Sequence, residues 1–239
     1  FKIDKKHAFA YGFEGVYNDV NSFASKKDLI IEENVITGFT PALPFPTRYP
    51  SKGSSYRSYA IYINWVWDLN TKLTLNAGLR LTDTSLQGEW KEYYNINALL
   101  SSVKLNSEAL TETLSLIYRP IIKTKWKAII SNGFRNPNID DVGKIRENRG
   151  YLIVPNPMLL PEYAYNFELG LTKYLKKEKN YISVQGFTTL ISRHIGRNNY
   201  PIFSDQTTTS NSTILYNGEE LITLANNNLG NRYMLGTSL

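Results

Sequence analysis

The segment Leu73–Thr82 reads LTLNAGLRLT, so an apolar residue occupies every second position. Successive side chains of a β-strand point to opposite faces, and a period of two therefore indicates a strand with one apolar and one polar face. The same alternation occurs in 58–67 and 165–172 and, more loosely, in 7–19, 108–118, 124–135 and 181–191, before a partial strand near the C-terminus. No segment keeps the 3.6-residue period of a helix, so we expect an all-β chain without long helices.

The connections between these segments alternate strictly between long and short. Turn signals give lengths of roughly 35, 4, 22, 6, 28, 6 and 28 residues. The short connections are 68–72, 120–125 and 176–180, and the long ones include the Pro-rich 40–50, the Asn/Asp/Arg-rich 136–150 and the Ser/Thr/Asn-rich 204–218. A compact soluble domain rarely contains several loops longer than about 15 residues. An antiparallel up-and-down transmembrane β-barrel has short turns on one rim and long loops on the other, so the pattern predicts such a barrel.

A soluble β-sandwich also alternates apolar and polar positions, but two features favour the membrane barrel. The strand ends are rich in Tyr, Trp and Phe, as expected of aromatic girdles at the membrane interfaces. The polar face carries Arg80 and Glu168 deep inside strands, where a water-lined or plugged lumen would solvate them. On the lipid face, an Arg near the midplane would cost about 2–4 kcal/mol.

Composition excludes several other classes of protein. The 239 residues contain no cysteine and only two histidines, so disulfide frameworks, cysteine-zinc sites and thiol nucleophiles are absent and a multi-His metal centre is disfavoured. No run of 18 apolar residues occurs, which excludes a spanning helix. Phe1 opens directly on a polar segment, so we expect any signal peptide to have been removed or to lie upstream. The net charge of +6 is spread through the chain and defines no partner.

The most distinctive stretch combines two boxes with a long loop between them. The first box is Phe134-Arg135-Asn136-Pro137, and the second is Asn156-Pro157-Met158-Leu159, followed by Pro161-Glu162 and by Asn166-Phe167-Glu168-Leu169-Gly170. The prolines fix φ and lack a backbone donor, so the chain leaves the strand ladder there as a stiff loop. Arg135 and Glu168 fall on the polar faces of their strands, and we expect them to pair across the lumen or to contact a plug.

These boxes closely resemble the barrel of TonB-dependent outer-membrane receptors, in which a Phe-Arg-Ala-Pro box ends a strand. A long extracellular loop, an Asn-Pro-Asn-Leu box, a Pro-Glu step and an Asn-x-Glu-Leu-Gly strand then follow. Asn136 replaces the Ala of the first box, and Met158 replaces the second Asn of the other. The family-motif residues carried over are Phe134, Arg135, Pro137, Asn156, Pro157, Leu159, Pro161, Glu162, Asn166, Glu168 and Gly170. From the residues alone, we expect them to shape the barrel and loop without needing to touch ligand.

The resemblance implies an outer-membrane receptor of a Gram-negative bacterium that captures a scarce nutrient, such as an iron-siderophore or haem-type complex, and imports it. The implied partners are TonB with its inner-membrane energy complex, outer-membrane lipid and lipopolysaccharide, and a small-molecule or metal-chelate ligand. Haem and haemoglobin receptors of the family carry a histidine between the boxes, whereas residues 138–155 here contain none and Tyr151 is the only obvious iron-ligating type.

Aromatic and basic residues cluster in the expected extracellular loops and form the candidate ligand-binding set. This set is Tyr49, Trp90, Tyr94, Arg146, Arg149, Tyr151, His194 and Arg197. Such side chains can stack on a catecholate or porphyrin and pair with its carboxylates. They can equally serve ordinary loop packing beside lipopolysaccharide.

Catalytic signals are missing from the sequence. Asp140-Asp141 has no accompanying base, and there is no Gly-x-Ser-x-Gly, phosphate-binding loop or zinc spacing. The Lys cluster Lys176, Lys177 and Lys179 lacks the interleaved aromatic residues of a nucleic-acid-binding surface. We therefore expect no enzyme activity, no cofactor, no metal site and no nucleic-acid partner.

Receptors of this family have about 22 strands around a plug, whereas seven strands and a partial eighth are counted here. We therefore expect residues 1–239 to be a segment of the receptor barrel, with the plug domain and the C-terminal strands absent from this chain. One alternative is a small, self-contained eight-stranded barrel of porin or adhesin type. The other is a soluble all-β binding or carbohydrate-active protein.

Overall fold

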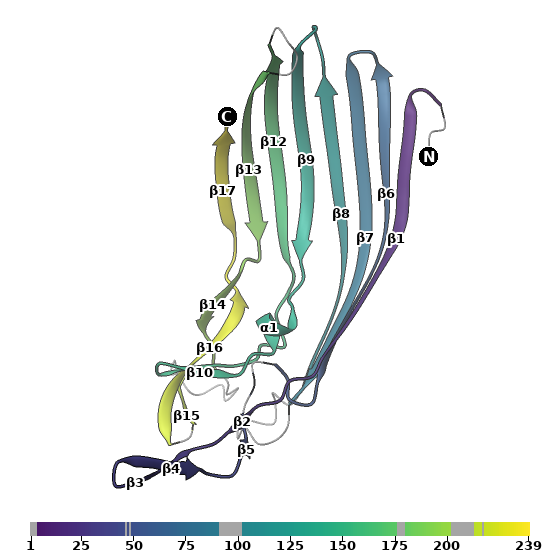
Figure 1. Ribbon diagram of the computed structural model, residues 1–239. Coiled ribbons are helices and arrows are strands. Elements are labelled where there is room, and N and C mark those ends of the chain that lie inside the picture. Colours follow the sequence, from purple (N-terminus) through teal and green to yellow (C-terminus); the bar gives the residue numbers. More distant parts are fainter. Residues whose placement is uncertain are drawn as a thin grey trace.

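The computed structural model describes residues 4–45, 47, 49–90, 102–175, 180–201, 213–216 and 218–239. The main element is one antiparallel sheet of eight long strands (Figure 1). These strands are β1 (His7–Val20), β6 (Ser54–Asn70), β7 (Leu73–Glu89), β8 (Ser102–Tyr118), β9 (Thr124–Arg135), β12 (Glu162–Tyr174), β13 (Tyr181–Ser192) and β17 (Arg232–Ser238). The sheet order is β1-β6-β7-β8-β9-β12-β13-β17, so each long strand pairs with the next one along the chain. The predicted all-β up-and-down arrangement is confirmed.

The two ends of the sheet differ, as the alternating connection lengths predict. Short turns join β6 to β7, β8 to β9 and β12 to β13 at one end, and the long connections gather at the other (Figure 1). β7 and β8 extend further toward the loop end than the alternation indicated, so the connection between them is shorter than predicted. No helix in the described residues is long and apolar enough to cross a bilayer.

Strand register gathers the apolar side chains on one face of the sheet. Phe13 lies opposite Ile61, Ile61 opposite Leu81, and Leu81 opposite Leu110, which makes a transverse row across four strands. All four side chains are exposed. Exposed apolar side chains in register are the outward face of a membrane barrel, since lipid covers them. We call this surface the apolar face.

The opposite surface, the polar face, carries ion pairs between strands. Arg80 of β7 pairs with Glu14 of β1 at 3.2 Å, with β6 between them, and its guanidinium lies over the ring of Tyr62. Lys127 of β9 pairs with Glu168 of β12 at 3.0 Å. Glu168 therefore takes its cation from an adjacent strand and not from across the lumen. Its contact with a plug stays a prediction.

Aromatic rings mark both ends of the apolar band. Near the short turns, the rings of His7, Trp65 and Trp67 stack on one another, with Phe9 against Trp65. Toward the loops, Phe13 stacks on Tyr59, and Phe134 packs on Tyr163. Two aromatic belts separated by an apolar band fit the two interfaces of a bilayer.

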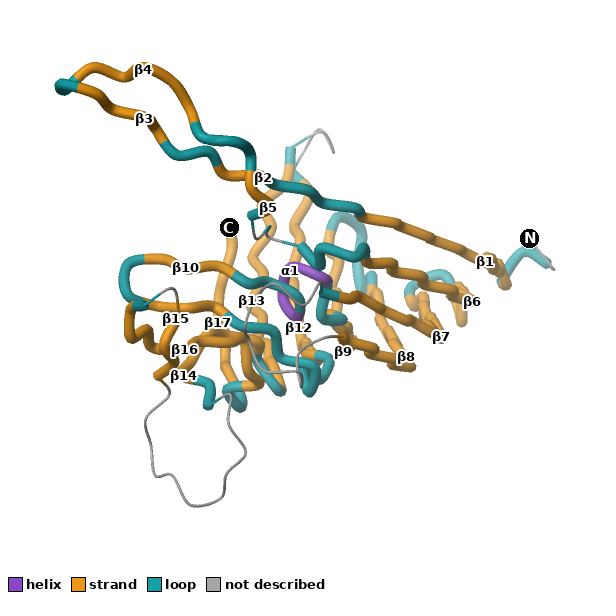
Figure 2. The backbone as a smooth tube through the Cα atoms, turned by 90° about the horizontal axis from the view of Figure 1, so that it is seen from below, coloured by secondary structure: helices purple, strands orange, loops and turns teal. Residues whose placement is uncertain are grey.

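The long connections contain short elements of their own (Figure 2). These are β2 (Ser25–Lys26), β3 (Leu29–Glu32), β4 (Val35–Phe39), β5 (Leu43–Pro44), α1 (Ile139–Val142), β10 (Arg146–Asn148), β11 (Tyr151–Ile153), β14 (Ile195–Asn199), β15 (Thr213–Tyr216) and β16 (Glu219–Asn228). β3 and β4 form a hairpin that extends away from the rest of the chain. β10, β11, β16 and β14 form the loop sheet in that order, with β15 on β16.

The ladder between β8 and β9 ends early, at the pair Thr113 and Ser131. Beyond it, the side chain of Asn132 takes the place of a backbone partner. Its Oδ1 accepts a 2.5 Å hydrogen bond from the backbone N–H of Glu112, and its Nδ2 donates to the carbonyl of Leu110 at 3.5 Å. A side-chain amide carries the same donor and acceptor as a peptide group, so Asn132 extends the ladder by one step.

A single added charge should distinguish the two faces. Ile130→Arg places a cation on the apolar face, and we expect it to destabilise the intact protein in lipid by about 2–4 kcal/mol. Ser131→Arg, one residue along on the polar face, should cost much less. Urea unfolding in phospholipid vesicles measures both, and equal losses of stability would contradict the assignment of faces.

Candidate functional site

A hydrophobic core lies under the loops and against the polar face of the sheet. Leu86 of β7 and Val103 of β8 contribute from the sheet, and Val142 of α1, Leu152 of β11 and Ala225 of β16 from the loops. Because Leu86 and Val103 have the same parity as the other polar-face residues of their strands, the loops fold inward over the polar face. The connections are therefore a packed assembly, which can hold surface side chains in fixed positions.

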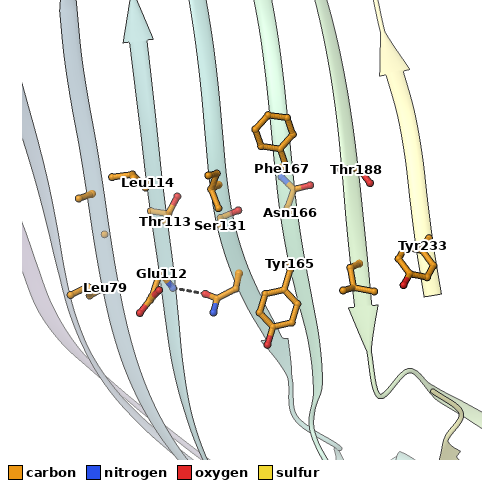
Figure 3. A pocket seen from close by; sticks show the side chains of 15 residues that line it. Leu79, Glu112, Thr113, Leu114, Ser131, Tyr165, Asn166, Phe167, Thr188 and Tyr233 are labelled. Carbon is orange, nitrogen blue, oxygen red and sulfur yellow. Dashed lines mark hydrogen bonds between the residues drawn. The ribbon is translucent and has the colours of Figure 1, made fainter. Parts of the chain in front are cut away.

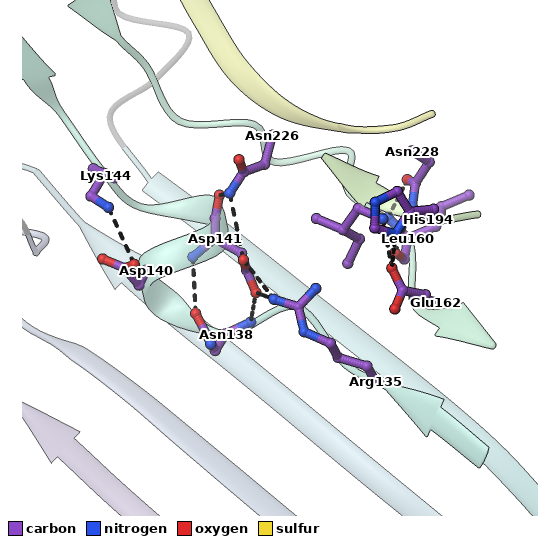
Figure 4. Close-up of polar contacts among 11 residues, drawn as sticks. Arg135, Asn138, Asp140, Asp141, Lys144, Leu160, Glu162, His194, Asn226 and Asn228 are labelled. Atoms are coloured by element: carbon purple, nitrogen blue, oxygen red, sulfur yellow. Dashed lines mark hydrogen bonds and ion pairs between the residues drawn. The ribbon is translucent and has the colours of Figure 1, made fainter. Parts of the chain in front are cut away.

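The first box contains the end of β9 and leads through Asn138 into α1 (Figure 4). The guanidinium of Arg135 donates to both carboxylate oxygens of Asp141, at 2.8 and 2.7 Å. Asn138 caps α1, since its side chain accepts from the N–H of Asp141, whose carboxylate accepts from the N–H of Asn138. Lys144 pairs with Asp140 at 3.2 Å. Arg135 therefore takes its anion from its own loop and fixes that loop locally. Its contact with a plug stays a prediction.

Asn136, the residue at which the first box departs from the family pattern, connects three strands. Its Oδ1 accepts from the hydroxyl of Ser107 on β8 at 2.5 Å, and its Nδ2 donates to the hydroxyl of Thr84 on β7. An alanine has neither group. The β8–β9 ladder has already ended at this point. The asparagine at position 136 therefore links the segment that follows β9 to β7 and β8 through its side chain.

Asn156 fixes the second box in place. The residue is 4% exposed, and both its side-chain oxygen and its side-chain nitrogen form hydrogen bonds. Its Nδ2 donates to the carbonyl of Asn226 at 2.8 Å and to Oδ1 of Asn227 at 3.1 Å. Its Oδ1 accepts from the N–H of Met158 at 2.9 Å and from the hydroxyl of Tyr200 at 3.3 Å. Asn156 is therefore structural, and Leu159 beside it is buried in the loop core.

The run Asn226–Asn228 at the end of β16 joins the parts of the assembly, and sequence reasoning missed it. Asn226 donates to the carbonyl of Asp141 at 3.1 Å. Asn228 donates to the carbonyls of Leu160 and Arg193 at 3.0 and 2.9 Å and accepts from the N–H of Leu160. Three successive asparagines are visible in the sequence, but nothing local indicates that their partners are 35 to 85 residues away.

Glu162, from the Pro-Glu step, ties β12 to β14. One of its carboxylate oxygens accepts from the N–H of Ile195 at 2.7 Å and lies 3.0 Å from Nδ1 of His194 (Figure 4). Further along β12, Asn166 accepts from the hydroxyl of Thr189 on β13 at 2.8 Å. His194, one of the candidate ligand residues, therefore already has its Nδ1 in contact with the carboxylate of Glu162.

Three candidate ligand residues share one face of the loop sheet. Arg146 lies opposite Ile153, and Tyr151 lies opposite Ile222, so both side chains are on the same face as Leu224 and Asn226 of β16. Arg197 lies opposite Asn226 and joins that face from the other edge. All three side chains are exposed. Three strand spacings, roughly 15 Å, separate the two arginines. We call Arg146, Tyr151 and Arg197 the loop-sheet surface.

The remaining candidates lie apart from this surface. Trp90 is 4% exposed and packs in the hydrophobic core of the loops, so its ring is not available on the surface. Tyr49 is half-buried beside Thr47, whose hydroxyl donates to its carbonyl. Arg149 is exposed in the β10–β11 turn at φ 50°. Tyr94 lies outside the described residues.

The described residues contain no group of three or more His, Asp or Glu side chains that could hold a metal ion. The loop-sheet surface instead offers two permanent cations and a phenol. This chemistry suits an anionic or aromatic ligand, since guanidinium groups pair with carboxylates and stack on rings.

An antiparallel meander with one apolar face, two aromatic belts, short turns at one end and folded loops at the other is the wall of an up-and-down transmembrane β-barrel. The family model described as "TonB dependent receptor-like, beta-barrel" matches residues 1–233. The chain belongs to this family, which confirms the resemblance seen in the two boxes.

Solved structures show the same fold at low sequence identity. The chain is similar to a double mutant of the Serratia marcescens hemophore receptor HasR in complex with HasA and heme (TM-score 0.67, 16% identity, 99% of this chain and 37% of that chain). It is also similar to the copper transporter OprC (TM-score 0.67, 12% identity, 98% and 32%). A third is the Neisseria meningitidis iron transporter FrpB (TM-score 0.55, 13% identity, 99% and 31%). The chain thus spans about a third of the length of these proteins. No curated protein matches it.

Removing the amide of Asn156 should loosen the second box while leaving the barrel strands intact. Asn156→Ala deprives buried partners of their hydrogen bonds, and we expect local opening to become easier by about 1–3 kcal/mol. Hydrogen exchange at the amides of Met158 and Leu160 reports this opening. Asn148→Ala, on the exposed strand β10, is the control and should change nothing. Unaltered exchange in Asn156→Ala would contradict the structural role.

Burial raises the pKa of the Tyr200 phenol above its ordinary value of 10. Above about pH 10, the phenol of the opened loop ionises while that of the folded loop keeps its proton. The free energy that favours the folded loop is therefore unaffected by this group below about pH 10 and decreases as the pH rises above that value. Hydrogen exchange around Thr223, corrected for intrinsic base catalysis, should accelerate in that range. Tyr200→Phe should remove the pH dependence. An identical pH profile in the variant would exclude Tyr200 as its source.

Proposed function

We propose that this chain is part of an outer-membrane active-transport receptor that captures a scarce nutrient and imports it with energy transmitted by TonB. The proposal rests on one observation: the chain is part of a TonB-dependent receptor barrel wall, and its loops pack around a hydrophobic core. We call these packed loops the loop platform. Hydrogen bonds of Arg135, Asn156 and Asn226–Asn228 fix the loop platform. Because its side chains are already held in place, ligand binding would lose little further conformational entropy.

The loop-sheet surface is proposed to contact the ligand. Arg146 and Arg197 would pair with carboxylates or catecholate oxygens, and Tyr151 would stack on or ligate the chelate. An iron-siderophore or haem-type complex has this chemistry. Similar structures include a hemophore receptor in complex with heme and the ferric-catecholate import receptor Fiu of E. coli (TM-score 0.57, 12% identity).

The receptor is proposed to need further strands and a plug. The described sheet is open, since β1 and β17 stand at its two ends and form no ladder with each other. An unpaired edge is not tolerated in hydrocarbon, so other strands must complete the barrel. This argues against an eight-stranded barrel closed on itself. The polar face would then surround a plug domain, through which TonB and its inner-membrane complex act.

Uptake by cells that depend on the intact receptor tests the transport function. With ferric catecholate or haem as sole iron source, we expect uptake that is lost when TonB is deleted. Uptake that persists without TonB would overturn the proposal. Failure of both probes, with TonB-dependent uptake of another nutrient, would revise the ligand class and leave the transport mechanism standing.

Charge reversal tests the loop-sheet surface. Arg146→Glu combined with Arg197→Glu should weaken binding of an anionic chelate roughly hundred-fold or more, since each of the two lost charged contacts contributes about 1.5–3 kcal/mol. Lys104→Glu, exposed near the loop end of β8 and outside the loop sheet, is the matched control. Binding measured on purified receptor should fall only in the double variant. Equal affinities would show that ligand binds elsewhere.

A further inference from the structure

Four basic residues gather in one groove at the turn end of the sheet. The groove has a volume of about 800 Å³ and lies among the β6–β7 turn, the β8–β9 turn and the end of β12 (Figure 1). The described residues that line it include Lys72, Arg119, Lys123 and Lys125, and none of them is Asp or Glu. By contrast, none of the 15 described residues that line a groove across the apolar face is Lys or Arg (Figure 3). We call the groove at the turn end the basic groove.

Backbone hydrogen bonds between neighbouring turns fix the walls of the basic groove. The N–H of Arg119 donates to the carbonyl of Lys72 at 2.7 Å, which joins the β8–β9 turn to the β6–β7 turn. The N–H of Tyr174 donates to the carbonyl of Lys123 at 2.8 Å, which joins the end of β12 to the β8–β9 turn. The groove is therefore already formed, and a partner that fits it loses little conformational entropy in ordering these turns.

The cations of the basic groove lie on the polar face of the sheet. Nη1 of Arg119 donates at 3.4 Å to the hydroxyl of Thr74, which has the same parity on β7 as Arg80. Lys125 has the same parity on β9 as Lys127. Since Arg80 and Lys127 form the ion pairs of the polar face, the basic groove opens toward the interior of the barrel.

Three of these cations have no ion pair with a carboxylate in the part of the chain that the structure describes. They are Lys72, Arg119 and Lys125. Asp68 lies on the same face, but its carboxylate accepts from the hydroxyl of Thr74 at 2.7 Å, and Arg119 contacts that hydroxyl rather than the carboxylate. Neighbouring cations raise the local positive potential, so the basic groove attracts an anionic partner.

We propose, on the basis of the function proposed above, that the basic groove docks an acidic segment of the plug. The plug is the partner because the groove opens on the face that surrounds it, and the charge of the groove selects carboxylates. These carboxylates pair with Lys72, Arg119 and Lys125. Ile121 and Ile122 line the same groove and are 62% and 84% exposed, so they suit an apolar side chain in the same segment.

The position of the basic groove gives this contact a role in transport. The short turns of an outer-membrane barrel face the periplasm. The docked segment is therefore on the side of the plug from which TonB acts. Ion pairs there hold the plug in the barrel while TonB is not engaged. Because these pairs are exposed to water, each contributes little, and together they can be broken by the energy that TonB transmits.

Opening of the barrel by urea tests this contact. The intact receptor is inserted into planar bilayers of phosphatidylcholine, and the urea concentration at which a steady conductance appears reports release of the plug. Arg119→Glu combined with Lys125→Glu should lower this concentration by roughly 0.5 M, because exposed ion pairs are replaced by repulsion. In about 1 M KCl, where the Debye length is about 3 Å, the difference between variant and native receptor should shrink.

A second pair of lysines provides the matched control. Lys5→Glu combined with Lys6→Glu changes the charge equally at the same end of the sheet, outside the basic groove, and should open at the native urea concentration. Heat-modifiable migration confirms that each barrel is folded. A native urea concentration in the folded groove variant would overturn the proposal, as would an equal decrease in the control.

Two further outcomes identify what is wrong if the account fails. A decrease that occurs only in bilayers containing phosphatidylglycerol would assign the basic groove to a lipid head group and overturn the plug contact. A native receptor that conducts without urea would show that no plug closes the barrel, which contradicts the proposed function itself. A closed native receptor with an unchanged groove variant would contradict only the docking of the acidic segment.

Discussion

Backbone hydrogen bonding inside a bilayer is the constraint on which this structure depends. Hydrocarbon offers no partner to a peptide group, so each strand must be paired along the part that crosses the membrane. All seventeen residues of β7 find partners in β8, and all but Glu89 also find partners in β6. Where β8 and β9 separate, Asn132 supplies an amide in place of the missing peptide group, and Asn136 reconnects the chain to β7 and β8 nearer the loops. Asparagine is suited to both positions because its side chain carries the donor and acceptor of a peptide bond.

Side-chain amides also take the place of backbone hydrogen-bonding partners in the loops. Outside the bilayer, the long connections could be solvated, yet Asn156, Asn226 and Asn228 bind backbone carbonyls and amides of segments far apart in the chain. Two charged residues of the boxed stretch act in the same way: Arg135 pairs with Asp141, and the carboxylate of Glu162 accepts from the backbone N–H of Ile195. This packing leaves Arg146, Tyr151 and Arg197 on one exposed face. The surface proposed to bind ligand is therefore positioned in large part by uncharged side-chain amides.

The strands were predictable from the sequence because period-two alternation is local, and segments such as Leu73–Thr82 need no knowledge of their neighbours. The boxes were also recognisable, as Phe134–Pro137 and Asn156–Leu159. The loop assembly was not predictable, because its contacts join residues such as Asn226 and Asp141, 85 positions apart. Trp90 illustrates the limit: an aromatic residue in a long connection suits ligand binding and loop packing equally, and only the fold shows it buried. Arg135 and Glu168 were placed on the correct face, but their partners proved to be nearby residues.

The central claim is that successive residues of each long strand face opposite sides of the wall. One set faces lipid, and the other faces an aqueous or plugged interior. Because the chain has no cysteine, single cysteines can be placed one at a time at positions 126 to 134 of β9 and tested in native membranes with a water-soluble maleimide. The structure predicts labelling at Lys127, Ile129, Ser131 and Gly133 once the interior is open to water, and protection at Trp126, Ala128 and Ile130. Uniform labelling, or protection without a period of two, would contradict the barrel wall described here.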